Sequence, residues 1–283
     1  IYDKVARMHA IAAYIADRLG LDAAQRDRID RAVDLCKTDL MTAVVFEVPS
    51  LQGHIGKIYA LEDCEAQDVA DAIEDHYKPR FSGEAQPTGM TSVVLSLAEK
   101  IDNIFGSFSV GNIPKGSADP YALRRQSNAI VELLIKNEIN LQLKDLLDSV
   151  AGNYRGGRDL AGKIVEFVAV RAKTIYADSG LSHDEIDACL STGASDYLEL
   201  YRRAKSVNQF RKNDNFSRML LSFKRMNNIV SAFRKENAAH ALTLDPSLFQ
   251  CDEERELHRF LGGSGELARH DIPPEIERAV GAQ

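Results

Sequence analysis

The chain has 283 residues, of which 45% are hydrophobic and 27% charged, the composition of an ordinary globular protein long enough for two domains. Its formal net charge of −7 excludes a generally basic nucleic-acid binder, so any RNA contact needs a local basic patch. No run approaches eighteen consecutive apolar residues, which argues against a membrane span. The four widely spaced cysteines form no C-x-x-C pair, which favours reduced thiols in a cytoplasmic protein and no zinc site. The chain starts at Ile1 rather than Met, which suggests a piece of a longer protein.

Apolar residues spaced three and four apart predict helices through the first half of the chain. A first helix runs from about Val5 to Leu19 and ends at Gly20, and a second, longer one covers Ile29–Val44. A short helix follows at 69–77, and a strongly apolar one at 93–108. Residues 111–120 are rich in Gly, Pro, Ser and Asn and predict a loop. At its end, Asp119-Pro120 predicts an N-cap followed by Pro at the first position of another helix.

The second half of the chain continues the helical pattern. Tyr154-Arg155-Gly156-Gly157 marks a boundary between residues 1–150 and 151–283. After it, Ser182 and Glu185 have capping-box spacing at the start of a helix, and two more helices are predicted around 197–210 and 216–233. Since no period-two run of β-branched residues occurs, the predicted fold class is all-α.

Residues 1–108 resemble the helical HD phosphohydrolase superfamily, which holds a divalent ion with a His, a His-Asp doublet and a later Asp. The doublet would fall at Thr38-Asp39, where a hydroxyl replaces imidazole and Lys37 stands alongside. The last carboxylate would be near Glu99 or Asp102, and His9 is the candidate first histidine. One hypothesis is a metal-dependent nucleotide phosphohydrolase. The other is that these carboxylates make buried hydrogen bonds or salt bridges between helices, and this second hypothesis predicts no metal site and no catalytic residue.

Three other motifs could bind a metal or phosphate but have simpler explanations. His183-Asp184 lies beside the predicted capping box, where acidic residues favour the helix dipole. His54 lies in a Gly-flanked segment and His76 near a helix end, and neither has a nucleophile nearby in sequence. The segment 111–117 contains Lys and Gly but lacks P-loop spacing and a preceding strand, which argues against a nucleotide cradle.

Two basic clusters are candidate RNA contacts. Lys115 precedes Arg124 and Arg125, which fall in the early turns of a predicted helix; they either meet an RNA backbone, or one pairs with a carboxylate while the other is solvated. Between Tyr201 and Lys235 there are ten basic residues and one acidic residue, Asp214. The aromatic residues interleaved there are expected mostly in a core, with the bases on an outer face. The residues predicted to contact RNA in this second cluster are Arg211, Lys212, Arg218, Lys224 and Arg225, with Asn227 either reading a base edge or satisfying backbone groups.

Several segments, taken in order, resemble the beta subunit of the tetrameric bacterial glycyl-tRNA synthetase. In the first half these are Leu35–Thr42, Leu51–Gly53, Ala72–Phe81, Ala98–Ile104 and Pro114–Arg125. Near the end, Ser222–Ile229 resembles the Lys-Arg-x-x-Asn-Ile signature of that family's helical anticodon-binding domain.

This resemblance implies a glycine–tRNA ligase beta subunit fragment. It implies an HD-like helical domain at 1–150 that has largely lost its metal ligands, then a helical linker and a truncated anticodon-binding domain at 151–283. The expected partners are glycine tRNA and a catalytic alpha subunit, in an assembly of two alpha and two beta subunits. ATP and Mg²⁺ are expected on that alpha subunit, with no cofactor in this chain. A third possibility is a scaffold for the alpha subunit that binds no RNA.

Overall fold

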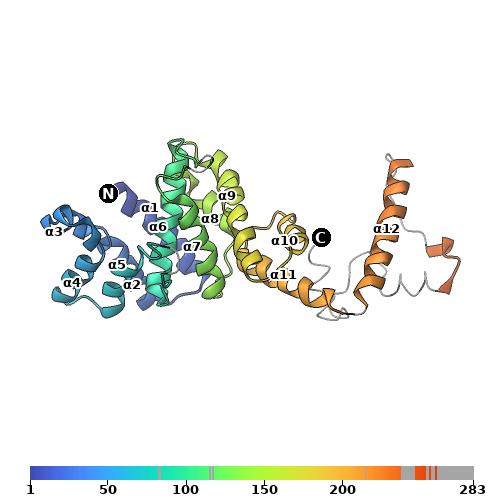
Figure 1. Cartoon of the computed structure of the whole chain (residues 1–283), viewed down its shortest axis with the longest axis horizontal. Coiled ribbons are helices and arrows are strands. Elements are labelled where there is room, and N and C mark those ends of the chain that lie inside the picture. The colour runs from blue at the N-terminus through green and yellow to red at the C-terminus, as the bar shows by residue number, and fades with distance from the viewer. Residues whose placement is uncertain are drawn as a thin grey trace. The chain divides into compact units, whose positions relative to one another are not determined.

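The computed structural model describes residues 1–81, 84–114, 116, 118–213, 215–236, 246–252, 255 and 259, without the side chains of 230, 233–236 and 246. Almost all of its regular structure is helical (Figure 1). The α-helices are α1 (Tyr2–Arg18), α2 (Ala23–Leu35), α3 (Ala43–Glu47), α4 (His54–Glu62), α5 (Gln67–Asp75), α6 (Met90–Ser109), α7 (Leu123–Lys136), α8 (Leu143–Val150), α9 (Gly157–Asp178), α10 (His183–Leu190), α11 (Tyr197–Arg211) and α12 (Phe216–Glu236). Short 3₁₀ helices are η1 (Thr38–Met41), η2 (Pro49–Leu51), η3 (Ala151–Asn153) and η4 (Pro246–Leu248).

The predicted all-α class is confirmed. Among the described residues no strand occurs, and an isolated β-bridge joins Gln142 to Asp196. The chain forms two compact units, unit 1 (Ile1–Arg202) and unit 2 (Arg203–Gln283). None of the helices described is long and apolar enough to cross a membrane.

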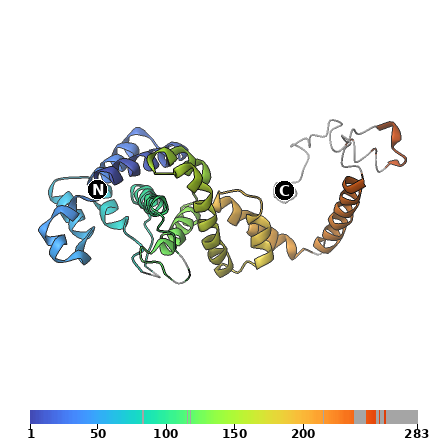
Figure 2. The ribbon, with the colours of Figure 1, turned by 90° about the horizontal axis from the view of Figure 1, so that it is seen from above.

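Helix α6 is the central element of unit 1. Its sequence is apolar on most of its circumference, and nearly every side chain from Thr91 to Ile104 is buried. Figure 2 looks almost along this helix, with other helices of the unit around it. It packs against α1, α2, α5, α7 and α9. Because neighbouring helices enclose α6 on almost every side, its charged residues Glu99, Lys100 and Asp102 lie inside the protein.

Local sequence signals set several helix ends as predicted. The first helix ends before Gly20, which has a φ of +63° that glycine adopts without strain. The capping box at Ser182 and Glu185 is confirmed, since the Glu185 carboxylate accepts the Ser182 backbone N–H at 2.9 Å. The apolar stripe at 93–108 is likewise confirmed as α6.

The long second helix predicted for Ile29–Val44 is wrong. Helix α2 ends at Leu35, and η1 and α3 follow. The chain turns because Asp39 is drawn inward, where its Oδ2 accepts the backbone N–H of Gly53 at 2.6 Å. Thr42 then starts α3, and its hydroxyl accepts the Val45 N–H. These side chain–backbone hydrogen bonds compete with continued helix.

The start of α7 also differs from the prediction. Asp119 does act as a cap, because its carboxylate accepts the backbone N–H groups of Leu123 and Arg124 at 2.8 and 2.9 Å. However, Pro120 is not the first helical residue, since α7 begins at Leu123 after Ala122 in a left-handed conformation. Asp119 therefore caps α7 from the far side of the turn at residues 120–122.

The compact units divide at Arg202 and Arg203, whereas the sequence suggested a division near residue 150. Helix α9 lies beyond that point, yet it packs on α6, α7 and α8 inside unit 1. The buried Tyr176 on α9 donates its hydroxyl to the carbonyl of Tyr197, which ties the start of α11 to the same unit. The division into an HD-like domain and an anticodon-binding domain remains a prediction about domain type.

Candidate functional site

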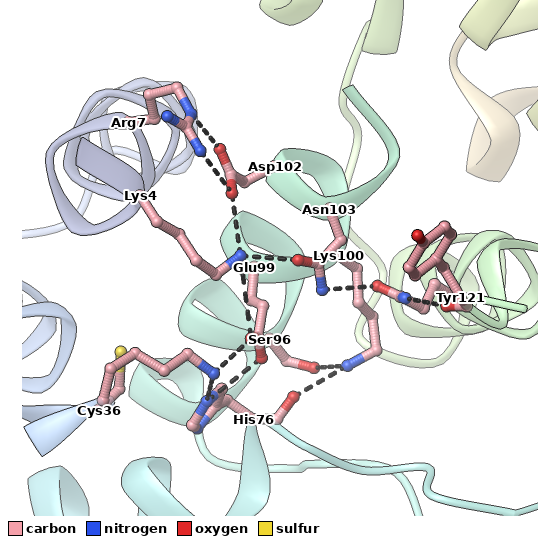
Figure 3. A network of polar contacts seen from close by, with 12 residues as sticks. Lys4, Arg7, Cys36, His76, Ser96, Glu99, Lys100, Asp102, Asn103 and Tyr121 are labelled. Atoms are coloured by element: carbon pink, nitrogen blue, oxygen red, sulfur yellow. Dashed lines mark hydrogen bonds and ion pairs between the residues drawn. The ribbon is translucent and has the colours of Figure 1, made fainter. Parts of the chain in front are cut away.

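The polar residues of α6 form a buried charged cluster with Lys37 and His76 (Figure 3). Lys37, the residue before η1, directs its ammonium group to Glu99 of α6 and to His76 Nε2, which is 2.7 Å away. The next residue of α6 is Lys100, whose Nζ donates to the His76 carbonyl at 3.0 Å and to Ser96 Oγ at 2.6 Å. All five residues are buried. The cluster joins three segments that are distant in the sequence.

His76 is held as a neutral imidazole. Its Nδ1 lies 2.8 Å from the carbonyl oxygen of Ile73, which can only accept, so Nδ1 carries the proton. Nε2 then accepts from Lys37. Burial and the nearby ammonium of Lys37 lower the pKa of His76 to about 3. This histidine is therefore an acceptor for Lys37 at neutral pH and not a proton shuttle.

Glu99 is the negative centre of the cluster. Burial alone would raise its pKa, but the attraction of His76, Lys37 and Lys4 outweighs burial and lowers the pKa to about 2. Since His76 is neutral at pH 7, the two lysines supply this attraction under ordinary conditions. Lys4 lies 4.0 Å from Glu99, and Lys37 is in direct contact with it. Glu99 is thus a buried carboxylate compensated by fixed ammonium groups.

A second set of buried contacts surrounds Asp102 and fastens α1 to α6. Lys4 and Arg7 of α1 donate to its carboxylate at 2.9 and 2.6 Å. Tyr154 donates its hydroxyl at 2.8 Å, and its ring stacks on Phe105 with 3.9 Å between the centroids. Although burial opposes it, hydrogen bonding to Arg7 and Lys4 lowers the pKa of Asp102. The predicted buried salt bridge between helices is confirmed for Asp102.

The other positions considered for a metal site do not meet in the structure. Thr38, which stands where the doublet would need a histidine, has an exposed side chain that donates to the carbonyl of Leu35 at 2.8 Å. His9 faces Asp30 and Asp34 on the surface, at 3.2 and 2.8 Å. Asp39 is buried and accepts the backbone N–H of Gly53, which confirms the predicted buried hydrogen bond for this residue. Within the described part of the chain, no group of three or more His, Cys, Asp or Glu side chains is arranged to hold a metal ion.

The two other histidines among the described residues lie at helix starts. His54 begins α4 and contacts Glu74 with its Nδ1 at 3.0 Å. His183 begins α10, next to the capping box. Cys36 is buried beside the charged cluster, and burial raises the pKa of its thiol to about 12, so it is an unreactive thiol at neutral pH.

One side of the charged cluster opens into a cleft of about 530 Å³, within the usual range for ligand pockets. Its basic lining residues are Arg80, Lys100 and Arg125. Arg80 and Lys100 were not among the predicted site residues. Arg80 lies in the motif at Ala72–Phe81, but no local pattern distinguishes it from a solvated arginine. The rest of the lining is Pro49, Ser50, Gln52, His76, Tyr77, Pro79, Glu99, Asn103, Tyr121, Ala122 and Gln126.

The structure separates the two adjacent arginines of α7. Arg124 turns back to the loop and donates to the carbonyl of Gly116 at 2.5 Å. Arg125 is exposed and lines the cleft. Both fall in the first turn of α7, as predicted. Lys115, the other candidate in this cluster, lies outside the described residues.

The basic candidates of the second cluster are on exposed positions of unit 2. Arg211 ends α11, Lys212 follows it, and Arg218, Lys224 and Arg225 lie on α12. Arg218 and Arg225 are seven residues apart and so share one face of α12, while Lys224 lies to the side. The residues at 234 and 235 are in α12, but their side chains are not described. An exposed row of bases is present here.

Asn227 lies on a different face of α12 from the basic residues Arg218 and Arg225. By helical spacing Asn227 shares a face of α12 with Phe216 and Phe223, and not with Arg218 and Arg225. Phe210 and Phe216 meet edge to face at 5.6 Å and are half-buried, while Phe223 is 39% exposed. None of Phe210, Phe216 and Phe223 is fully buried, so the expectation that the aromatic residues are mostly core is wrong.

The chain is similar to known proteins over most of its length. The family model described as "Glycyl-tRNA synthetase beta subunit" matches residues 1–191. The chain belongs to this family. A "Glycine--tRNA ligase beta subunit" of Desulforamulus reducens is 41% identical over 81% of this chain and 34% of its own length. Relatives with the same description from Syntrophomonas wolfei and Moorella thermoacetica are 36% and 34% identical, over 87% and 96% of this chain and 36% and 39% of their own lengths.

The chain therefore spans about a third of the length of the glycyl-tRNA synthetase beta subunits it matches. The match at 1–191 lies within unit 1, which contains the buried charged cluster and the cleft. The resemblance based on short motifs is confirmed at the level of the family.

Proposed function

We propose that this chain is the tRNA-binding portion of a glycine–tRNA ligase beta subunit, which positions glycine tRNA for aminoacylation by an alpha subunit. Support comes from the family and from the exposed bases of α11 and α12. In this proposal Arg211, Lys212, Arg218, Lys224 and Arg225 neutralise phosphates of the tRNA backbone, and Arg125 contacts RNA from unit 1. Lys115 and Arg124 are further candidate phosphate contacts in this proposal, and Arg124 also donates to the carbonyl of Gly116.

In the same proposal, glycine activation with ATP and Mg²⁺ belongs to the alpha subunit, in an assembly of two subunits of each kind in the cytoplasm. The position of the Lys37 ammonium group supports the assignment of Mg²⁺ to the alpha subunit and not to this chain. Its ammonium group pairs with Glu99 and His76, the two side chains of the cluster best suited to a metal. A fixed positive charge in that place opposes a divalent cation, and no observation favours the phosphohydrolase.

The experiment is binding of glycine tRNA over a salt series, with the double variant Lys224→Ala/Arg225→Ala. Two lost phosphate contacts should lower the slope of log affinity against log salt by about 2 and weaken binding at low salt. The matched control is Arg158→Ala/Lys163→Ala, which removes the same charge from exposed positions of α9. That variant should bind like the unchanged chain.

Two outcomes would contradict the proposal. Equal weakening in both double variants would mean that overall charge, and not the surface of α12, determines binding. Retained binding to the alpha subunit with no tRNA affinity at low salt would instead favour a scaffold.

A further inference from the structure

The cleft of unit 1 contains an arginine whose hydrogen-bonding capacity is unused. Nε and Nη2 of Arg80 are buried, yet neither has a hydrogen-bond partner among the described residues. The nearest acidic contact, Glu84, accepts the backbone N–H of Arg80 and not the guanidinium group. Buried donors left unpaired cost about 1–3 kcal/mol each, and more when charged, so such donors indicate a missing acceptor.

Lys100 reaches the same cleft with spare capacity. Its ammonium group has three donors, and the described contacts use two of them, on the His76 carbonyl and Ser96 Oγ. Burial lowers the pKa of Lys100 to about 8, against the attraction of Glu99. Glu99 itself is bound to Lys37. An additional negative group in the cleft would stabilise the ammonium form of Lys100.

The opposite wall comes from α7 and the turn before it. Arg125 is exposed, lines the cleft, and has no hydrogen bond or ion pair with any described residue. Tyr121 stands at the cleft with 56% of its surface exposed. Two hydrogen bonds of Gln126 fix the turn before α7 (Figure 3). Its side-chain oxygen accepts a hydrogen bond from the Asn103 amide at 2.8 Å, and its amide donates to the Tyr121 carbonyl at 3.0 Å. The backbone of Tyr121 is thus fixed at a cleft that three cationic side chains also line.

We propose that this cleft binds the phosphate group of a nucleotide unit, with Arg80, Lys100 and Arg125 as phosphate ligands and Tyr121 stacking on the base. The planar guanidinium fork matches phosphate oxygens, and Arg80 has two donors without a partner among the described residues. Exposed aromatic rings beside a basic groove are the usual platform for an unpaired base. A nucleotide unit combines an anion and a flat ring, which are the two features that the cleft accommodates.

The proposed site shares no residue with the basic positions of α11 and α12, and nucleotide binding there does not depend on tRNA binding by those positions. The nucleotide unit could be a free mononucleotide or part of a single RNA strand, since both present the same phosphate and base. The probes are therefore adenosine monophosphate, inorganic phosphate, and a short single-stranded RNA. Calorimetric titration of the whole chain with each probe distinguishes these sources.

We expect saturable binding of adenosine monophosphate, with inorganic phosphate binding more weakly because it lacks the stacking base. Arg125→Ala should weaken the binding of both by about ten- to a hundredfold, the loss of a charge-assisted hydrogen bond. Tyr121→Ala should weaken adenosine monophosphate and leave inorganic phosphate unchanged. Both residues are exposed, so their replacement leaves the fold intact. Arg80→Gln tests the inner ligand, with its melting temperature measured in parallel.

Arg158→Ala is the matched control, since it removes one exposed arginine of unit 1 outside the cleft lining. Tighter binding of the single-stranded RNA than of the mononucleotide would identify an RNA strand as the source, and the reverse a free nucleotide. No saturable binding of any probe, or equal losses in Arg125→Ala and Arg158→Ala, would overturn the inference. Neither result bears on the Lys224 and Arg225 test, which concerns unit 2.

Discussion

Replacing Lys37 by Met tests whether the buried cluster is held by a fixed positive charge. Lys37 and Glu99 have side chains only 5% and 9% exposed, and they are in direct contact. The ammonium group also lies 4.0 Å from the centroid of the Tyr77 ring. Methionine keeps most of the volume but removes the direct lysine contact of Glu99, and leaves it with the neutral His76 at 3.2 Å and the ammonium group of Lys4 at 4.0 Å. Breaking one side of a buried pair costs about 3–5 kcal/mol, so the free energy of unfolding at pH 7 should fall by about that amount.

The double variant Lys37→Met/Glu99→Gln separates this charge effect from packing. With both charges removed, the loss should shrink to about 1–2 kcal/mol, because replacing a buried pair costs much less than leaving one charge unpaired. Far-ultraviolet circular dichroism in a urea series measures all three variants, including Glu99→Gln alone. A loss below about 1 kcal/mol in Lys37→Met, or a double variant as unstable as the sum of the singles, would refute the reasoning.

The remaining predictions concern acid stability and backbone packing. His76 has a pKa of about 3 in the folded chain against an ordinary 6.5, so the unfolded chain binds the extra proton and stability should fall as pH drops below about 6.5. The decline should reach about 1.4 kcal/mol per pH unit, and Glu99 adds to it below its ordinary value of 4.5. In a urea series at each pH, His76→Gln should flatten the part between pH 6.5 and 5, and an unchanged slope there would exclude His76 as its cause. Gly157→Ala should cost at least about 2 kcal/mol, because the new Cβ would lie 2.2 Å from the carbonyl oxygen of Ala151. Gly162→Ala in the same helix meets nothing within 4 Å and should stabilise by about 0.5–1 kcal/mol, so equal melting temperatures for the two variants would contradict this packing argument.

Local sequence patterns determined most of the helices in this protein. The apolar repeats at α1 and α6, the glycine at 20 and the capping box at Ser182 act within one or two turns, so a linear reading reveals them. The family could also be recognised from the order of short motifs. The end of α2 could not be predicted, because it depends on Asp39 meeting the backbone of Gly53, fourteen residues away.

The arrangement of the candidate site was decided by the tertiary structure alone. Lys37 lies 39 residues from His76 and 62 from Glu99, and no periodicity links such positions. Only the packing of α5, α6 and the segment before η1 brings the three together, and burial then determines their charge states. Arg80 and Arg125 likewise become cleft residues because α7 packs beside α6. Helix propensity is a property of neighbours in the chain, whereas a binding cleft is a property of surfaces that meet only after folding.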